Sequence, residues 1–432
     1  MTDIRRVLHI TAHLGGGVGK ALSGLMLQAA ASHTGFRHSI VTLEEQERSQ
    51  FMDLIIGSGC EVVVCPSPEC LRRLIESSDI VQLEWWNHPA TLQALCSQAP
   101  PPMRLLVWSH VSGLFNPIIP VGLLLAAHQF LFTSACSFAA CSVKSLPVAL
   151  SSRIGVVSSG GGFDEVSSFG TRPAAGLVAG YLGSLNFAKL HPHYVDFLLE
   201  VRLAGFRVRL IGEETNKEIL EKQCLQAGRA GMLEFRGFTD NVAAELASLN
   251  VLVYLLNPEH YGTTENALIE AMAMGIVPVV LNNPAERHIV EHGRTGLIVS
   301  SPGEFAEAVH WLHENPEELR RMGREAAKSV RDRFSVGKNA GLLNSYYSAM
   351  MSLEKESISF VDIFGSDPAD WFLSCQGYPE FFSDSGNGSA FANSYSSFGL
   401  LERTKGSVFH FLNYFPDDLR LNQWSKKLTS LL

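Results

Sequence analysis

A threonine loop and two carboxylates stand close together late in the chain. The loop ends at Thr263 and Thr264, and Glu265 and Glu270 follow it in a segment of helical character. A loop of small residues that runs into a helix presents backbone N–H groups and the positive end of the helix dipole, and both favour an anionic diphosphate. Glu270 lies one to two turns further along, where a carboxylate can accept hydrogen bonds from a ribose diol. These residues predict a site for a nucleoside diphosphate.

Polar residues also follow two predicted strands of the first half. His110 ends an apolar strand, and Glu84 and His88 follow another, next to Trp85 and Trp86. In doubly wound sheets, ligands bind outside the carboxyl ends of the strands. We therefore expect His110 to line a ligand site, with a partly buried histidine satisfied by the backbone as the alternative. The two tryptophans offer faces for stacking on a sugar, although aromatic pairs are more often part of a core.

A glycine-rich turn follows the first predicted strand. It contains Gly16, Gly17 and Gly19 and leads into a helical pattern. The sequence argues against a phosphate-binding P-loop, because Leu14 and Ala21 occupy positions where that motif needs glycine and a hydroxyl residue. The glycine spacing also fits a dinucleotide fingerprint poorly. A flexible turn at a helix N-terminus remains, with a tight turn that binds nothing as the alternative.

Two segments of the second half carry a family resemblance. Glu270 to Val280 resembles the carboxylate signature of retaining, nucleotide-sugar-dependent glycosyltransferases of family 4, with one extra residue before the proline. Gly183 to Lys189 is similar to the family segment Gly-Arg-Leu-x-x-x-Lys, in which arginine and lysine hold the diphosphate. Lys189 matches, whereas Ser184 replaces the arginine. The resemblance covers roughly residues 5 to 350 and is strongest from Gly176 to Thr295.

The resemblance implies roles for further residues. The backbone at Phe238 would meet the nucleobase, and His110 would lie near the donor sugar and the acceptor. The glycine turn would approach the donor diphosphate. The family pattern has a second carboxylate eight residues before the ribose ligand, but Gly262 stands there. Either Glu265, which we expect at the start of the helix, or Glu259 would then supply that carboxylate.

By this resemblance the protein is a hexosyltransferase of the GT-B fold. It would move a sugar from a nucleoside-diphosphate sugar to a hydroxyl of a carbohydrate or lipid-linked acceptor with retention of configuration, in surface polysaccharide or glycolipid synthesis. We expect no metal and no cofactor besides the donor, and no Asp-x-Asp triplet occurs. Two alternatives stay open. A non-catalytic scaffold is suggested by Ser184 and the altered carboxylate spacing, and a nucleotide-sugar epimerase would share the two-domain layout.

Composition sets outer limits on these hypotheses. The 432 residues are 46% hydrophobic and 18% charged, which suffices for two cores. A net charge of −9 argues against a broad nucleic-acid-binding face. The eight cysteines lack zinc-site spacing, and the first residues lack the apolar core of a signal peptide, so we expect reduced thiols in the cytoplasm. The apolar run Gly122 to Phe132 is too short to span a membrane, and we predict a buried helix there, with contact to a membrane surface as the alternative.

Apolar strands alternate with helical patterns in both halves, which indicates two tandem doubly wound α/β domains with a ligand between them. The predicted strands are residues 6–11, 39–43, 62–64, 80–83, 105–108, 176–183, 208–211, 233–235, 251–254 and 277–280. We predict domains at residues 1–170 and 171–350, the second closing with a helix over 316–351. Residues 351–432 form a C-terminal extension of unknown role. It contains a Ser/Gly-rich loop, Ser383 to Ser397, and we expect it to dock through aromatic residues, namely Trp371, Phe411, Phe415 and Trp424.

Overall fold

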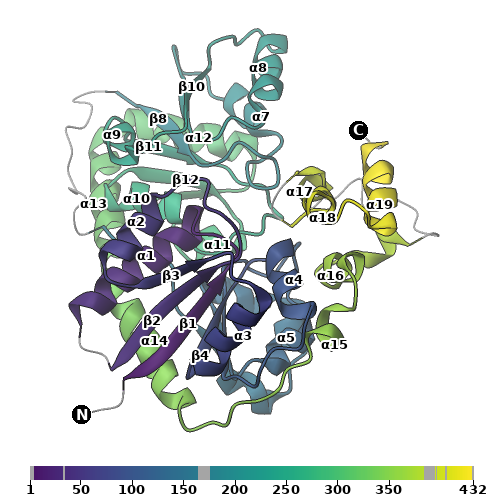
Figure 1. The fold of residues 1–432 in the computed structure, drawn as a ribbon. Coiled ribbons are helices and arrows are strands. Elements are labelled where there is room, and N and C mark those ends of the chain that lie inside the picture. The colour runs from purple at the N-terminus through teal and green to yellow at the C-terminus, as the bar shows by residue number, and fades with distance from the viewer. Residues whose placement is uncertain are drawn as a thin grey trace. The chain divides into compact units, whose positions relative to one another are not determined.

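The computed structural model describes residues 4–32, 35–163, 176–383, 395, 397–403 and 406–430. These residues form two compact units (Figure 1). The first unit contains residues 1–161, 261–264 and 336–432, and the second contains residues 162–260 and 265–335. The chain therefore enters the second unit after residue 161, returns to the first for four residues, and leaves the second for good after residue 335.

The first unit contains a sheet of seven parallel strands in the order β3-β2-β1-β4-β5-β6-β7. The strands are β1 (Arg5–Thr11), β2 (Phe36–Thr42), β3 (Glu61–Val64), β4 (Ile80–Trp85), β5 (Leu105–Ser109), β6 (Gln129–Phe132) and β7 (Ile154–Val156). Every residue of β4, β5 and β6 is buried, as expected when helices cover both faces of a parallel sheet. The register pairs Leu8 with Val81 and Val81 with Leu105, so the carboxyl ends of β1, β4 and β5 share one edge.

Alternate strand residues face two separate cores. Leu106 and Leu131 pack with α1 and α14, whereas Leu105 and Phe130 pack with α4 and the C-terminal extension. The helices of this unit before the extension are α1 (Gly16–Ala31), α2 (Gln50–Gly57), α3 (Pro68–Ser77), α4 (Pro89–Cys96), α5 (Val121–Ala126), α6 (Cys141–Lys144) and α14 (Val336–Met350), with 3-10 helices η1 (Ala135–Ala139) and η2 (Val148–Arg153).

The second unit contains six parallel strands in the order β10-β9-β8-β11-β12-β13. They are β8 (Ala179–Leu182), β9 (Val208–Ile211), β10 (Leu233–Gly237), β11 (Val251–Tyr254), β12 (Val277–Leu281) and β13 (Leu297–Val299). The helices are α7 (Tyr194–Leu199), α8 (Lys217–Gln226), α9 (Val242–Ala247), α10 (Asn266–Ala273), α11 (Pro284–Arg287), α12 (Pro302–Glu314) and α13 (Pro316–Arg333). Two parallel sheets flanked by helices confirm the predicted fold class of two Rossmann-like domains.

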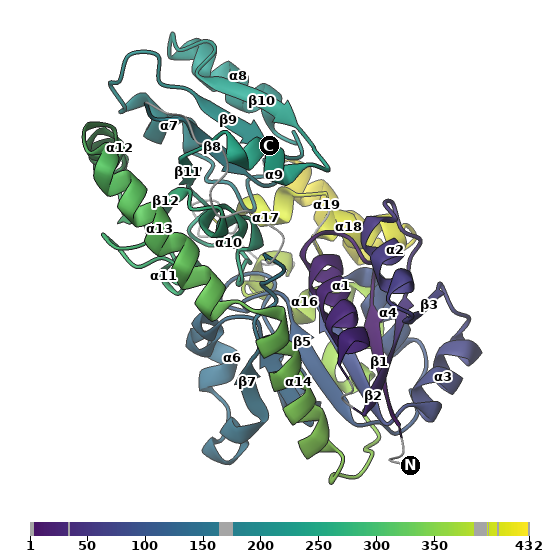
Figure 2. The same ribbon diagram turned by 90° about the vertical axis from the view of Figure 1, so that its left-hand side faces the viewer.

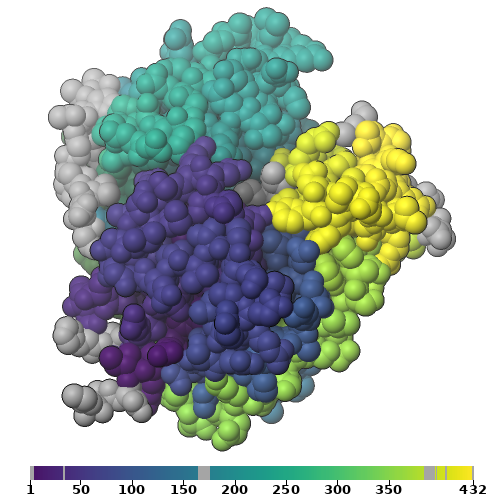
Figure 3. All heavy atoms as spheres, viewed as in Figure 1, coloured from purple at the N-terminus to yellow at the C-terminus, as the bar shows by residue number. Residues whose placement is uncertain are grey.

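The C-terminal extension is an integral part of the first unit. Its helices lie beside α4 and α5 (Figure 1), and residues 406–430 form a closely packed body (Figure 3). Phe411 is fully buried, and Trp371 packs edge-on against Phe415 with ring centroids 5.5 Å apart, so the predicted aromatic docking is confirmed. Most of the loop predicted from Ser383 to Ser397 lies outside the described residues. The elements are α15 (Phe360–Phe364), α16 (Pro368–Ser374), η3 (Pro379–Phe382), α17 (Ser397–Leu401), α18 (Val408–Tyr414) and α19 (Leu419–Thr429).

Two predictions from hydrophobic pattern are wrong. The run Gly122 to Phe132 is not one buried helix, because α5 ends at Ala126 and β6 begins at Gln129 and pairs with β5. The predicted helix over residues 316–351 is two helices, α13 and α14, separated at Phe334 and Ser335 (Figure 2). The second of them packs on α1, so residues 336–350 belong to the first unit rather than to the second domain, where the sequence placed them.

All eight cysteines lie within the described residues and are free thiols. Burial raises the pKa of Cys96 and of Cys375 to about 12, so neither is a reactive thiolate near neutral pH. Among the described residues, no helix is both long enough and apolar enough to cross a membrane.

Candidate active site

The second unit brings its candidate residues together where β8 and β11 end. The chain after β8 leads through Ser184 to Lys189, and the chain after β11 leads to His260. Backbone hydrogen bonds join the two connections: the Asn257 N–H donates to the Lys189 carbonyl at 2.7 Å, and the His191 N–H donates to the Leu255 carbonyl at 3.0 Å. These bonds fix the backbone that carries Lys189 against the end of β11.

Lys189 is paired with Glu265, the residue just before α10. Its Nζ lies 3.0 Å from Oε2 of Glu265, and the Tyr254 hydroxyl donates to the same oxygen at 2.6 Å. The Glu265 side chain is 1% exposed, whereas the Lys189 side chain is 23% exposed. The carboxylate is therefore an internal anchor, while the lysine reaches the surface of its unit.

His260 extends this network to a second buried carboxylate. Its Nδ1 lies 3.8 Å from Oε1 of Glu265, and its Nε2 lies 3.2 Å from Oε2 of Glu286. The Asn283 amide donates to the other oxygen of Glu286 at 3.1 Å. The result is a row of ionisable groups in the order lysine, glutamate, histidine, glutamate.

Burial and neighbouring charges act in opposite directions on the pKa values of Glu265 and His260. Burial alone would raise the pKa of Glu265, but Lys189, His260 and the Tyr254 hydroxyl outweigh it, and the pKa lies below its ordinary value. Burial would likewise lower the pKa of His260, but Glu286 and Glu265 outweigh it and hold the pKa above its ordinary value. A lysine held by such an anchor presents a fixed cation that can meet a phosphate oxygen.

The other predicted residues of the second unit flank this row in the chain. The Asn186 amide donates to the Ser184 hydroxyl at 3.0 Å, and the Tyr181 hydroxyl donates to the Ser184 carbonyl at 3.0 Å. Glu270 is partly buried on α10, and the Phe238 side chain, directly after β10, is 49% exposed. Their predicted contacts with diphosphate, ribose and base stay predictions.

Thr263 and Thr264 belong to the first unit. The Thr133 hydroxyl donates to the Thr263 hydroxyl at 3.1 Å, and the Thr264 hydroxyl donates to the Thr133 carbonyl at 2.7 Å. The Ser112 N–H donates to the carbonyl of Tyr261 at 2.9 Å. The Thr264 hydroxyl proton is therefore used by the chain that follows β6, and a role of Thr264 in phosphate binding would rest on its backbone.

His110 lies directly after β5 and is held by a carboxylate. Its N–H donates to the Trp85 carbonyl at 2.8 Å, and its ring Nε2 lies 2.8 Å from Oε2 of Glu84. The His110 side chain is 8% exposed and Glu84 is fully buried. The sequence left open a histidine that is satisfied by the backbone. In the structure the His110 ring instead forms its hydrogen bond with a side chain, Glu84.

Glu84 also receives hydrogen bonds from the interior of the sheet. His9 Nδ1 lies 3.0 Å from Oε1 of Glu84, and the Gln82 amide donates to the same oxygen at 2.7 Å. His9 Nε2 lies 2.9 Å from Nδ1 of His38. Burial and the neighbouring His9 lower the pKa of His38 to about 3, so its ring is neutral at physiological pH.

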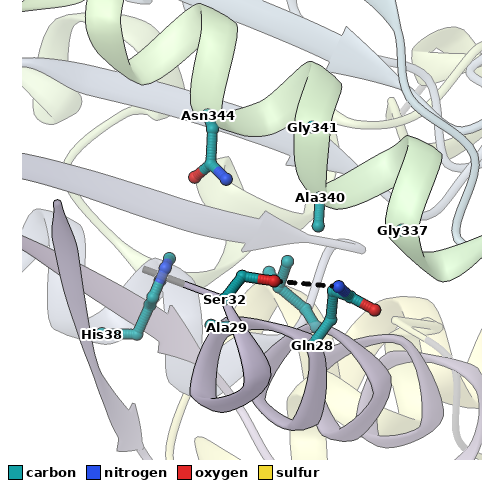
Figure 4. Close-up of a pocket in the computed structure, with 9 residues that line it drawn as sticks. Gln28, Ala29, Ser32, His38, Gly337, Ala340, Gly341 and Asn344 are labelled. Atoms are coloured by element: carbon teal, nitrogen blue, oxygen red, sulfur yellow. Dashed lines mark hydrogen bonds between the residues drawn. The ribbon is translucent and has the colours of Figure 1, made fainter. Parts of the chain in front are cut away.

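His38 borders a cavity of 180 Å³ between α1 and α14 (Figure 4). Gln28 donates to the Ser32 hydroxyl at 3.0 Å on one wall, and Asn344 points into the space from the other. The cavity exists because Gly337, Ala340 and Gly341 of α14, which line it, have small side chains or none. Cavities that bind drug-sized ligands measure about 300–1,000 Å³, so this one is too small for a sugar nucleotide.

The glycine turn divides into exposed and buried positions. Gly16 and Gly17 are exposed at the start of α1, and Gly16 has a φ of 57°. Gly19 is buried, and a Cβ there would lie 2.0 Å from the Leu14 carbonyl oxygen. Packing therefore explains Gly19 without a ligand, whereas Gly16 and Gly17 have the exposure that binding requires.

One cluster has the residue types of a metal site. A ligand atom from each of His13, Glu44 and His88 lies within 4.8 Å of the others. However, Nδ1 of His13 accepts the Gly15 N–H and Nδ1 of His88 accepts the Ala90 N–H. A neutral ring that accepts at Nδ1 carries its proton on Nε2, so in this arrangement the rings offer donors and not the lone pairs that a metal needs.

Trp85 cannot serve as a sugar-stacking face. It is fully buried and stacks on Phe364 of α15 at a centroid distance of 5.3 Å, so the structure corrects that expectation. Trp86 is partly buried and lies 4.6 Å from the His88 ring.

Comparison with known proteins bears on the second unit. Residues 171–329 match the family model of glycosyl transferases group 1. This segment resembles the glycosyl transferases group 1. It contains the predicted residues from Ser184 to Glu270, and over this segment the match confirms a resemblance to glycosyl transferases group 1. His110 and the glycine turn lie outside the matched segment.

A curated relative matches part of the chain. The chain is 32% identical over 98 residues to the GDP-Man:Man(3)GlcNAc(2)-PP-Dol alpha-1,2-mannosyltransferase of Dictyostelium discoideum. The match covers 22% of this chain and 19% of the mannosyltransferase.

Solved structures share the fold. HepE of Anabaena, solved in complex with UDP, has a TM-score of 0.64 at 15% identity over 80% of this chain and 100% of its own. Sucrose-phosphate synthase of Thermosynechococcus elongatus has a TM-score of 0.62 at 14% identity over 81% of this chain and 99% of its own. At such identities the likeness shows the fold alone, and that fold is GT-B.

Sequence reasoning missed the partners of Lys189 and Glu265. Tyr254 closes β11, and His260 and Glu286 follow β11 and β12. Each stands at or beyond the carboxyl end of a strand, where polar residues are candidates for ligand contact. That rule, applied to every strand of the second half, would have selected them.

Proposed function

We propose that the protein is a glycosyltransferase that transfers a sugar from a nucleoside-diphosphate sugar to a hydroxyl. The observation that carries the proposal is Lys189 in the segment that matches the group 1 family model, a partly exposed ammonium 3.0 Å from a buried carboxylate. This arrangement gives the unit one positioned cation beside the start of α10, where the helix dipole also favours an anion.

The reaction breaks the bond between the anomeric carbon and the diphosphate oxygen and forms a bond to the acceptor oxygen, whose proton leaves. Negative charge grows on the departing diphosphate, so a preorganised ammonium lowers the barrier. Lys189 supplies that charge, and Glu270 accepts hydrogen bonds from the ribose. Because Glu265 is buried and anchors Lys189, we propose that it positions the lysine and does not touch the sugar. Retention of configuration follows from the family resemblance, and the chemistry proposed for these residues uses no metal.

The comparisons support either UDP or GDP as the nucleotide of the donor. HepE is described as a complex with UDP, whereas the name of the mannosyltransferase gives GDP-Man as its donor. That name also gives a Man(3)GlcNAc(2)-PP-Dol acceptor. A lipid-linked or polysaccharide acceptor for this chain, and with it a cytoplasmic enzyme that meets a membrane surface, is proposed on this basis and on the family resemblance.

Ser184 favours a second candidate, a non-catalytic GT-B partner protein. It replaces the arginine of the family segment, and its hydroxyl accepts a hydrogen bond from Asn186. One charge-assisted contact to the diphosphate is therefore absent at this position. A protein of this kind would retain the fold and lack turnover.

The test is release of nucleoside diphosphate from UDP-, GDP- and ADP-sugars. We expect slow hydrolysis or transfer with one donor, abolished in Lys189→Ala and in Glu270→Ala. Two exposed residues of the same unit serve as matched controls, Lys222→Ala on α8 and Glu307→Ala on α12, and both should keep full turnover. Absence of turnover with every donor, together with no thermal stabilisation by UDP, GDP or ADP, would favour the partner protein.

A further inference from the structure

Glu84 collects three hydrogen bonds deep in the first unit. Its Oε2 lies 2.8 Å from the His110 ring, and its Oε1 lies 3.0 Å from His9 and 2.7 Å from the Gln82 amide. Glu84, His9 and Gln82 are all fully buried. A lone carboxylate in such a place is costly to bury unless every neighbour points a donor at it.

The direction of each hydrogen bond follows from the charge on Glu84. Burial would raise the pKa of Glu84, but hydrogen bonds from His110 and His9 outweigh it and hold the pKa below its ordinary value. An ionised carboxylate only accepts hydrogen bonds, so His110 must carry a proton on Nε2 and His9 must carry one on Nδ1. The Gln82 amide also turns its nitrogen toward Glu84, because its oxygen accepts the Tyr347 hydroxyl at 2.5 Å.

The same logic extends to the next ring. A neutral His9 with its proton on Nδ1 has its lone pair on Nε2, so it accepts from Nδ1 of His38 at 2.9 Å. The neutral state of His38 agrees with this direction. Five side chains from β1, β2, β4, α14 and the end of β5 are thus oriented by one carboxylate.

We propose that Glu84 is a positioning residue that fixes the tautomer of His110, so that Nδ1 of the neutral ring is an acceptor for a sugar hydroxyl. This inference rests on the proposed glycosyltransferase function, because it gives His110 a sugar to meet. His110 lies directly after β5, at the edge of the sheet where ligands bind in this fold. The sequence pointed to His110 and to Glu84 separately, and the structure joins them.

The variant Glu84→Gln isolates the tautomer, since it removes the charge with almost no change in volume. Its amide oxygen satisfies the most donors if it faces His9 and Gln82, which turns the amide nitrogen toward His110. Nε2 of His110 must then accept, and the ring proton moves to Nδ1. The ring would offer a donor where the native protein offers an acceptor.

The experiment combines NMR with kinetics. Ring nitrogens of protein labelled with ¹⁵N-histidine are observed at about pH 8, where an ordinary imidazole is neutral. The His110 signals among the 15 histidines are assigned by their loss in His110→Gln. We expect the proton on Nε2 in the native protein and on Nδ1 in Glu84→Gln. With a donor that the native protein turns over, kcat should fall about 10- to 100-fold in Glu84→Gln, with a smaller change in KM. This loss is expected because the ring nitrogen that faces the sugar hydroxyl would donate a hydrogen bond instead of accepting one. Glu61→Gln, an exposed residue on β3, should match the native protein in both measurements.

Several results would overturn the inference. One is a native His110 with its proton on Nδ1, and another is a moved proton with unchanged kcat. If Glu84→Gln does not fold, the native spectrum still decides the tautomer, and Glu84→Asp, which retracts the carboxylate, should weaken the preference for Nε2. If no donor is turned over by the native protein, the proposed function fails on its own, and the spectra still decide whether Glu84 sets the tautomer.

Discussion

The Lys189–Glu265 pair makes a quantitative prediction for the stability of the second unit. In Lys189→Met the apolar stem is retained and the charge is lost, so Glu265 stays buried with Tyr254 and His260 as its remaining partners. Removing one partner of a buried ion pair costs about 3–5 kcal/mol. Because Lys189 is 23% exposed and two partners remain, we expect a smaller loss of about 2–3 kcal/mol.

Hydrogen exchange resolved to peptides measures this loss within one unit. Peptides from β11 and α10 report on the second unit, and peptides from β1 and β4 report on the first. A loss of 2–3 kcal/mol corresponds to exchange that is faster by roughly 30- to 150-fold. We expect that increase in β11 and α10 alone, and we expect Glu265→Gln combined with Lys189→Met to restore most of the protection.

Two results would refute this account of the pair. Exchange in β11 and α10 that changes less than about threefold would mean that Lys189 does not stabilise the buried carboxylate. Equal losses in Lys189→Met and in the double variant would show that the cost does not come from the uncompensated charge of Glu265. Lys222→Met on α8 is the matched control, because its side chain is exposed.

Two further predictions follow from the same structure. Glu265 stabilises the fold above its unfolded pKa of 4.5, and this contribution is lost as pH falls through its lowered folded pKa. His260 stabilises the fold below its unfolded pKa of 6.5, and this contribution is lost as pH rises through its raised folded pKa. The stability of the second unit is measured at each pH by urea titration, with a pulse of hydrogen exchange at one fixed pH as the readout. The second unit should lose stability below pH 4.5 and above pH 6.5, and His260→Gln should remove the loss at high pH. Phe372 of α16 is fully buried among Phe382, Phe411 and Trp424. Phe372→Ala should lower the stability of the first unit alone by about 3–5 kcal/mol, measured by hydrogen exchange. Unchanged exchange in the β1 peptides would contradict the conclusion that the C-terminal extension is an integral part of that unit. Phe138→Ala, at an exposed position, is its control.

Much of the fold could be predicted because most strands are short apolar runs bounded by turns. The strands 208–211 and 251–254 were predicted with the observed bounds. Those missed, β6, β7 and β13, have three or four residues, and their identity depends on pairing with a neighbour rather than on local pattern. The assignment of α14 to the first unit also depends on tertiary packing, because the sequence of a helix does not specify the sheet against which it packs.

The candidate site was only partly readable for a similar reason. Motif spacing selected Lys189 and Glu270, and chain position placed Glu265 before α10, as the structure has it. The burial of Glu265 depends on Tyr254 and His260, and Glu286 follows another strand. Contacts between residues on different strands leave no periodic trace in a single sequence.

The most direct test of the donor site is a crystal structure of the protein with the nucleoside diphosphate that the turnover assay selects. The account predicts diphosphate oxygens within about 4 Å of the Lys189 ammonium, the distance of an ion pair, and ribose hydroxyls hydrogen-bonded to Glu270. A diphosphate bound away from Lys189, with Glu270 facing solvent, would contradict the central claim.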